Sequence, residues 1–236
     1  MGMFLRRGPA PRRTRMSDLE IGSSIKLNLN GTPWEWLVVH QGLPSDIYDA
    51  SCNGTWLLSK DIYENRKWNS SSVNKYESST IHSYLNSAFQ NMFDSNIKDA
   101  IKQVKIPYRK NGGTGGTNQI GANGLPTKIF LLSGYEVGWT TSDSSSFPQD
   151  GAKLSYFESG TGTSADRKRS AKFKGSNGAW GLRSPCADNT SYGTSAMWEV
   201  ANDGRKLLAE ASSTLGIRPA IILPSDMLVT DDMLAE

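Results

Sequence analysis

The chain has 236 residues, enough for one sizeable domain, and a hydrophobic content of 37%, which is adequate for a packed core. Such values exclude disorder throughout; no run approaches the ~20 apolar residues of a membrane helix, and the first residues lack the apolar stretch of a secretory signal. We therefore expect a protein made in the cytosol, without membrane insertion.

A basic, extended arm is predicted over residues 1–18. The net charge of +3 becomes −2 once five arginines of the arm are left out, and no acid lies among them: Arg6, Arg7, Arg12, Arg13 and Arg15. Gly8, Pro9 and Pro11 disfavour a helix that could enter a nucleic-acid groove. We expect this arm to dock on neighbouring protein subunits, and nucleic acid is the less favoured partner.

The first half of the domain, which is expected to span residues 19–228, shows clear periodicities. Alternating apolar and polar residues predict strands at 24–29 and 34–40 around an Asn30-Gly31 turn, followed by a buried strand at 55–59. Ser78 or Ser79 can cap a helix, and a second helix is predicted from about Asp94. Apolar side chains at helical spacing are Ile81, Leu85, Ala88, Phe89 and Met92 in the first helix and Ile97, Ile101 and Val104 in the second.

The second half is richer in Gly, Ser and Thr. Residues 111–124 contain six glycines and no lysine, which predicts a flexible loop and argues against a phosphate-binding P-loop. A short strand is expected at 129–133 and later strands at 180–183, 196–200 and 217–223, before an acidic tail over residues 229–236. Residues 159–178 are predicted to be a solvated linker with a basic cluster: Arg167, Lys168, Arg169, Lys172 and Lys174.

Residues suited to catalysis or metal binding do not form a motif. Cys52 and Cys186 stand far apart without a CxxC partner, so two free thiols are expected. His40 and His82 adjoin apolar residues and are interpreted as structural. We expect no enzyme, no catalytic or metal-ligating residue and no cofactor, although a structural cation stays possible.

Three residues near the late strands are interpreted as scaffold. Arg183 and Arg218 each follow an apolar residue and precede a proline closely, and a guanidinium has five donors for carbonyls where loops meet a sheet. Trp180 opens the segment that these arginines delimit. A ligand-binding role for the two arginines is the alternative.

Three late motifs resemble C-type-lectin-fold proteins of gut bacteria and their phages, several of which are variable targets of diversity-generating retroelements. The motifs are Trp180-Gly-Leu-Arg-Ser-Pro, Trp198-Glu-Val-Ala-Asn-Asp-Gly and Gly216-Ile-Arg-Pro-Ala-Ile-Ile-Leu-Pro. Earlier segments are similar to the phage-encoded branch: Trp36-Leu-Val-Val-His-Gln-Gly, Cys52-Asn-Gly-Thr-Trp-Leu-Leu, Ser79-Thr-Ile-His-Ser-Tyr-Leu-Asn and Lys105-Ile-Pro-Tyr-Arg. This resemblance implies an α+β, C-type-lectin-like fold with two helices, small antiparallel sheets and abundant loops.

The resemblance also implies an exposed, hypervariable ligand face within residues 178–216. Its side chains would be those of Gly181, Asp188, Asn189, Ser191, Tyr192, Trp198, Glu199, Ala201, Arg205, Lys206, Leu208, Glu210 and Ser212. Tyr192, Trp198 and Arg205 are the expected anchors, because aromatics and arginine dominate interface energetics; a core position is the alternative for Trp198. Such families commonly carry a second aromatic where Gly181 stands.

Three functions are compatible with these patterns. The first is a virion-associated protein that binds a bacterial surface protein or glycan through the variable face, acts as a homo-oligomer and docks on other virion proteins by its arm. The second is a structural decoration, tail or head-fibre component without diversified binding. The third is an enzyme like the formylglycine-generating oxidases, which share the general fold and use a cysteine pair with copper; Cys52 and Cys186 lie outside any matching motif.

Overall fold

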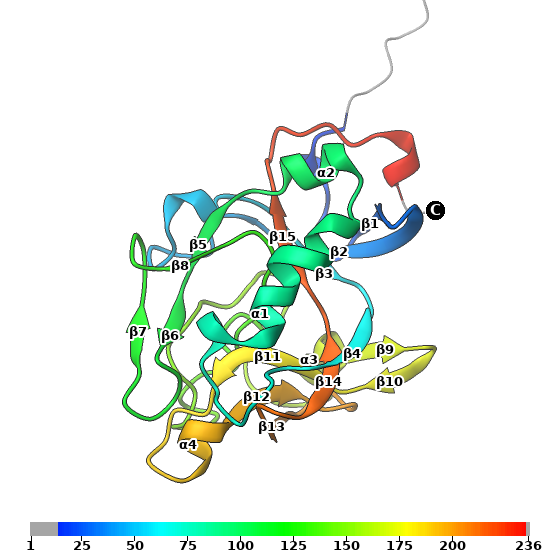
Figure 1. Cartoon of the computed structure of the whole chain (residues 1–236). Coiled ribbons are helices and arrows are strands. Elements are labelled where there is room, and N and C mark those ends of the chain that lie inside the picture. Colours follow the sequence, from blue (N-terminus) through cyan, green and yellow to red (C-terminus); the bar gives the residue numbers. More distant parts are fainter. Residues whose placement is uncertain (1–13, 235–236) are drawn as a thin grey trace, which may run out of the picture.

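The computed structural model describes residues 14–234 as a mixed α+β domain with two main sheets and three small two-stranded sheets (Figure 1). The predicted arm residues Arg6, Arg7, Arg12 and Arg13 lie outside the described residues. The first sheet has the order β1-β2-β3-β15. Its antiparallel strands are β1 (Ser24–Leu29), β2 (Thr32–Gly42), β3 (Gly54–Ser59) and β15 (Ala220–Leu223).

The second sheet has five strands in the order β13-β12-β11-β14-β4, with β11 parallel to β14 and the other pairs antiparallel. Its strands are β4 (Glu64–Lys67), β11 (Trp180–Pro185), β12 (Ala196–Val200), β13 (Lys206–Glu210) and β14 (Thr214–Ile217). The small pairs join β5 (Val104–Ile106) to β8 (Leu125–Thr127), β6 (Tyr108–Lys110) to β7 (Thr117–Gln119), and β9 (Ala171–Phe173) to β10 (Ser176–Gly178).

The helices are short and lie in the connections between strands. They are α1 (Thr80–Tyr84), α2 (Ser95–Ala100), α3 (Thr163–Arg169) and α4 (Tyr192–Ser195). Ser79 caps α1 by accepting from the His82 N–H, which confirms one of the two predicted caps. The first predicted helix continues beyond α1 through a π-helical turn (Leu85–Phe89) and a 3-10 turn (Gln90–Met92). No helix within residues 14–234 is long and apolar enough to cross a bilayer.

The core lies between the two sheets and under α1. Most apolar residues of the predicted strands and helices are buried there, but Ala88 is exposed and Met92 only partly buried; the buried ones include Trp56, Leu57, Ile81, Leu85, Phe89, Ile97, Ile101 and Ile221. The predicted strands at 24–29 and 55–59 are confirmed, and the Asn30-Gly31 turn has the positive φ of 51° and 75° that such turns need. Periodicity therefore identified the first sheet and most of its packing.

Tertiary contacts override several predictions in the middle of the chain. Val104 belongs to β5 rather than to α2, which ends at Ala100. The predicted flexible loop at 111–124 contains β7, and the Gly113 backbone packs so tightly that an added Cβ would lie 1.9 Å from the Cys186 carbonyl oxygen. Residues 129–133 are buried in an extended segment without being a strand, apart from a bridge between Phe130 and Ala220.

The predicted solvated linker at 159–178 is also wrong, because it contains α3 and the β9–β10 hairpin. With α3 and the later α4, residues 14–234 contain four α-helices where two were predicted. Arg169 is fully buried, and its guanidinium donates to the carbonyl oxygens of Val137, Glu158 and Gly160. The polar sequence around Arg169 predicts a solvated side chain, but carbonyl oxygens from earlier in the chain bind it instead.

Both ends of the described chain pack on the domain. Arg15 forms a β-bridge with Leu228, and Met16, in the 3-10 turn Met16–Asp18, is buried. Met233, in the 3-10 turn Asp231–Met233, is buried as well, whereas Asp231 is exposed. Residues 15–18 and 229–234 are thus parts of the domain, and in Figure 1 both ends lie at the top, far from α4 and the second sheet.

Candidate functional site

The predicted ligand face centres on β13, the edge strand of the second sheet. In the register of β12 and β13, Glu199 lies opposite Leu207 and Trp198 opposite Leu208. A backbone hydrogen bond lies beyond each end of this ladder. The Ala201 N–H donates to the Arg205 carbonyl oxygen, and the Ala211 N–H donates to the Ser195 carbonyl oxygen. In an antiparallel pair this pattern directs the backbone N–H and C=O groups of residues 206, 208 and 210 away from β12, along the edge of the sheet, where the Glu210 carbonyl oxygen accepts from the Ser213 N–H.

Alternation along the strands divides the predicted residues between two faces. Trp198, Leu208 and Lys206 point to one side, and Glu199 and Leu207 to the other. The prediction of one continuous face across β12 and β13 is therefore wrong. A period of two cannot place consecutive residues on the same side of a sheet.

Trp198 is a core residue. Its ring stacks on Phe147 with centroids 4.0 Å apart and an interplanar angle of 22°, and Phe147 in turn stacks on Trp139. The Trp198 indole N–H donates to the Ser146 carbonyl oxygen at 3.3 Å, and the residue is only 5% exposed. The prediction that Trp198 is an exposed anchor is wrong, because the 139–147 segment covers its face.

Glu199 and Gly181 are buried as well, contrary to prediction. Glu199 is 5% exposed, its Oε2 has no hydrogen-bond partner among the described residues, and burial raises the pKa of its carboxyl. Gly181 lies beside it, and an added Cβ would approach Met197 Cε at 3.1 Å and Trp68 Cδ1 at 3.2 Å. Trp68 thus fills the space that a larger residue at position 181 would need.

The α4 segment, residues 187–195, reaches the surface as predicted. Asn189 and Ser191 are exposed, and Tyr192 is 54% exposed. Asp188 is partly buried because its carboxylate holds the segment together: Oδ1 accepts from the Thr190 N–H and hydroxyl, and Oδ2 from the Ser146 hydroxyl. These bonds, those of Thr190 first, lower the pKa of Asp188. Its carboxylate is a structural clamp and presents few free lone pairs to a ligand.

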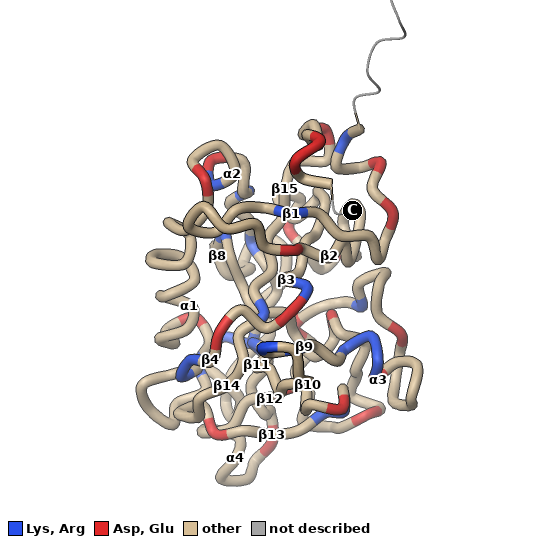
Figure 2. The backbone as a smooth tube through the Cα atoms, turned by 90° about the vertical axis from the view of Figure 1, so that its right-hand side faces the viewer, with Lys and Arg blue, Asp and Glu red and all other residues tan. Residues whose placement is uncertain are grey.

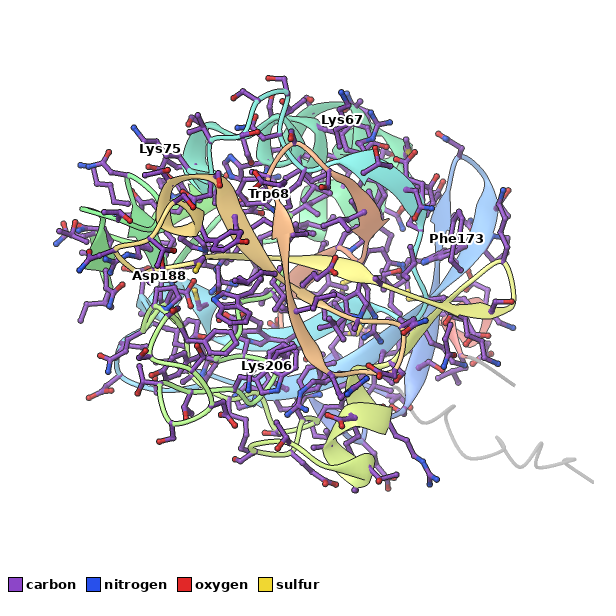
Figure 3. All side chains as sticks on the ribbon, turned by 90° about the horizontal axis from the view of Figure 1, so that it is seen from below. Lys67, Trp68, Lys75, Phe173, Asp188 and Lys206 are labelled. Carbon is purple, nitrogen blue, oxygen red and sulfur yellow. The ribbon has the colours of Figure 1, made fainter. Side chains whose placement is uncertain are left out.

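The turn between β12 and β13 lies at the other end of β13. Arg205 is exposed, and its Nε donates to Asp203 Oδ2 at 2.6 Å. Ala201 and Lys206 are partly buried. Asp188 and Lys206 lie apart on the underside shown in Figure 3, so α4 and this turn are separate ends of one strip.

The remaining predicted residues lie near α4. Glu210 is exposed, and its Oε1 accepts from the Ser195 hydroxyl at 3.4 Å. Ser212 is partly buried, with its hydroxyl 3.1 Å from that of Ser72. Leu207, which was not predicted, is 53% exposed between these two ends. Strand alternation through β13 would have selected it in place of Leu208, which packs against the core.

The surface that results is narrower than the predicted face, and we call it the β13 edge surface. It consists of the free backbone edge of β13, of Leu207 and Glu210 on opposite sides of that edge, and of exposed side chains in the adjoining segments: Asn189, Ser191, Tyr192 and Arg205. It combines an aromatic ring, an aliphatic group, both charge signs and unpaired backbone groups. Such a combination suits recognition of another molecule rather than bond-making chemistry.

Arg183 has the scaffold role that was predicted. It is 1% exposed and forms a bidentate ion pair with Glu136, Nη1 to Oε2 at 2.6 Å and Nη2 to Oε1 at 2.7 Å. The other donors bind the carbonyl oxygens of Pro107, Leu131 and Asp150, so all five N–H groups have an acceptor. Trp180 is buried too, and its indole N–H donates to the Arg169 oxygen at 3.0 Å.

Asp150 beside this pair makes stability depend on pH. Burial raises the pKa of its carboxyl from 3.8 to about 7, and Oδ2 accepts from the Ser184 hydroxyl at 2.8 Å. A carboxyl with a raised pKa contributes its full stability below the ordinary value and loses it as the pH rises towards the folded-state value. We expect this contribution to the free energy of unfolding to fall between about pH 4 and about pH 7.

Asp150→Asn removes the titrating group and keeps an acceptor for Ser184. Urea unfolding across this pH range should show a shallower fall for Asp150→Asn than for the unmodified protein. Identical pH profiles would contradict this assignment.

The cysteines and histidines do not form a reactive site. Cys52 and Cys186 are free and buried, and burial raises the pKa of each thiol to about 12, which disfavours the nucleophilic thiolate. Burial lowers the pKa of both His40 and His82. Over residues 14–234, no group of three or more His, Cys, Asp and Glu side chains could hold a metal ion.

A family model described as a domain of unknown function (DUF6273) matches residues 53–225. The chain belongs to this family. The match covers every strand from β3 to β15 and therefore includes the whole β13 edge surface. No curated protein and no solved structure matches the chain.

Proposed function

We propose that this member of the DUF6273 family is a phage virion-associated protein that binds a bacterial surface protein or glycan through the β13 edge surface. The proposal includes a C-type-lectin-like fold and diversification of exposed positions by a retroelement. It involves no catalytic step. The observation that carries it is the exposure of Leu207 in the edge strand β13, of Arg205 in the turn before that strand and of Tyr192 in α4.

The chemistry of these side chains favours binding. A half-exposed tyrosine has a large, rigid contact area and loses little conformational entropy on binding, and arginine can pair with carboxylates or stack on rings. Folding does not need these side chains, because the core around Trp198 and Arg183 is complete without them. Their identity can therefore change with the ligand while the fold is kept.

The placement of the chain ends favours attachment at the opposite side. Arg15 and Leu228 pair at the end of the domain that lies far from α4 in Figure 1. We propose that the arm, with Arg6, Arg7, Arg12 and Arg13, docks on other virion proteins and that the protein acts as a homo-oligomer. Several copies then bind a cell surface with avidity, even where each contact is weak.

Binding of the purified full-length protein to host cells tests the proposal. We expect the double substitution Tyr192→Ala and Arg205→Ala to weaken binding by about tenfold or more, because aromatic and arginine side chains often each contribute over about 1 kcal/mol at an interface. Lys26→Ala, which removes a partly exposed cation in β1 of the other sheet, is the control. Absence of binding, or equal weakening by the control, would remove the basis of the proposal.

The free edge of β13 also favours a second candidate, a structural decoration protein. An unpaired strand can add to the sheet of a neighbouring particle protein through backbone hydrogen bonds, with little dependence on side chains. The genome that encodes the protein distinguishes the two candidate functions. A reverse transcriptase gene beside a near-copy of the region coding for residues 180–219, differing mainly at adenines, supports diversified binding and argues against decoration.

A further inference from the structure

Arg218 differs from the other buried arginines in its hydrogen bonding. It is 2% exposed, and its guanidinium donates to the carbonyl oxygens of Ser59 at 2.8 Å, Lys60 at 3.0 Å and Arg169 at 3.4 Å. Because a guanidinium has five N–H donors, two of them lack an acceptor among the described residues. Arg183, by contrast, has all five satisfied.

Arg218 also lacks a carboxylate partner. Within residues 14–234, no carboxylate oxygen lies within 4.0 Å of its guanidinium, whereas Arg183 pairs with Glu136 and Arg169 with Asp166. Burial lowers the pKa of Arg218 to about 10, with Tyr156 and Asp61 partly opposing that shift. A buried cation without a counter-ion is costly, and an anion from outside the chain would reduce that cost.

Arg218 is one of the residues that line a surface cavity. The cavity has a volume of about 390 Å³ and lies between β2, β3, α3 and the β9–β10 hairpin. Its lining includes Arg218, Lys60, Arg167 and Lys172, with Asp61 as the acidic member. Figure 2 shows a run of Lys and Arg positions in α3, close to β9 and β10.

The cations around the cavity are largely available to a ligand. Lys60 pairs with Glu35, but no carboxylate of the described chain lies within 4.0 Å of Arg167 or Lys172, and both are exposed. Asp61 already accepts from the Lys172 backbone N–H at 3.1 Å. The cavity therefore combines a buried, incompletely bonded guanidinium with two exposed cations at its rim.

Neutral groups in the lining indicate a ligand larger than a bare ion. Tyr156, Ser170 and Asn177 add a phenol ring, a hydroxyl and an amide, and the volume is that of a site for a small organic molecule. These groups suit hydroxyl-bearing rings, whereas the arginines and lysine suit an oxyanion.

We propose that this cavity, the Arg218 pocket, binds a small organic anion such as a sugar-sized group that carries a carboxylate, sulfate or phosphate. The pocket lies outside the β13 edge surface and shares none of its residues, so the inference goes beyond the proposed function. Arg218 forms the floor and bonds the oxyanion, Arg167 and Lys172 add charge at the rim, and Tyr156 contacts the body of the ligand.

Titration calorimetry of the full chain with inorganic phosphate, sulfate and glucuronate tests the pocket. We expect saturable binding of at least one probe, and the strongest one identifies the class of oxyanion. The double substitution Arg167→Glu and Lys172→Glu should weaken that binding by about tenfold or more, since charge-assisted hydrogen bonds are lost and repulsion replaces them. Both side chains are exposed, so folding should be unaffected.

A second double variant controls for net charge. Lys67→Glu and Lys174→Glu change the charge by the same amount at exposed positions outside the pocket. Weakening specific to the Arg167 and Lys172 variant supports the site. No saturable binding of any probe, or equal weakening by the control variant, would overturn it. Neither outcome touches the cell-binding test, which concerns other residues.

Discussion

Replacing Arg183 by leucine is expected to lower the free energy of unfolding by about 3–5 kcal/mol. The change leaves the Glu136 carboxylate buried without its bidentate partner, and the remaining bonds from the Tyr48 hydroxyl and the Ser133 N–H cannot balance its charge. It also removes the donors to three carbonyl oxygens that belong to different segments of the chain. Urea unfolding measured by circular dichroism gives the quantity directly.

The double variant Arg183→Leu and Glu136→Leu separates the cost of a buried, unpaired carboxylate from the loss of the hydrogen bonds that Arg183 donates to the loops. If the isolated carboxylate causes most of the loss, the double variant should be more stable than Arg183→Leu alone, because an apolar pair can replace a buried ion pair at small cost. Arg205→Ala serves as the exposed control and should leave unfolding unchanged. If Arg183→Leu lowers the free energy of unfolding by less than about 1 kcal/mol, the hydrogen bonds of Arg183 are not what holds these loops on the second sheet.

Replacing Trp198 by alanine is expected to lower the free energy of unfolding by about 3–5 kcal/mol, as for other buried large aromatics. The indole stacks on Phe147 and is almost fully buried, so its removal leaves a cavity under the 139–147 segment. Thermal and urea unfolding measure this loss.

Tyr192→Ala is the matched aromatic control for Trp198→Ala. Its ring is 54% exposed, and the substitution should change stability by less than about 0.5 kcal/mol. Unchanged stability in Trp198→Ala would mean that Trp198 acts at the surface, as the sequence first suggested. The two variants together test which aromatic of the late segment belongs to the fold and which is free for a partner.

These expectations limit which positions of the late segment could vary if the surface is diversified as we propose. The segment between Trp180 and Pro219 is not dispensable as a whole, because β12 is buried along its entire length. In the α4 segment, the 201–205 turn and β13, the exposed side chains have substantial freedom from the core, whereas Gly193 and Gly204 are buried and leave no room for a side chain. Diversified positions, on our proposal, should fall among the exposed positions and avoid Trp198, Glu199 and Gly181.

The sequence by itself determined features that depend on near neighbours. Alternation over 24–29 and the Asn30-Gly31 turn define the first hairpin, and Ser79 with Ile81, Leu85 and Phe89 defines the α1 region. The scaffold role of Arg183 could be predicted as well, since a guanidinium between apolar strand residues next to proline has few uses other than binding carbonyls.

Only the tertiary structure decided which side of each late element is covered. Trp198 is buried because the distant Phe147 stacks on it, Arg169 because carbonyls of the 137–160 region bind it, and residues 111–116 are held because Gly113 meets the Cys186 backbone. A local pattern reports the period of a strand or helix, but burial depends on segments remote in sequence that the pattern does not contain. The β13 edge and the Arg218 pocket are both products of such remote contacts.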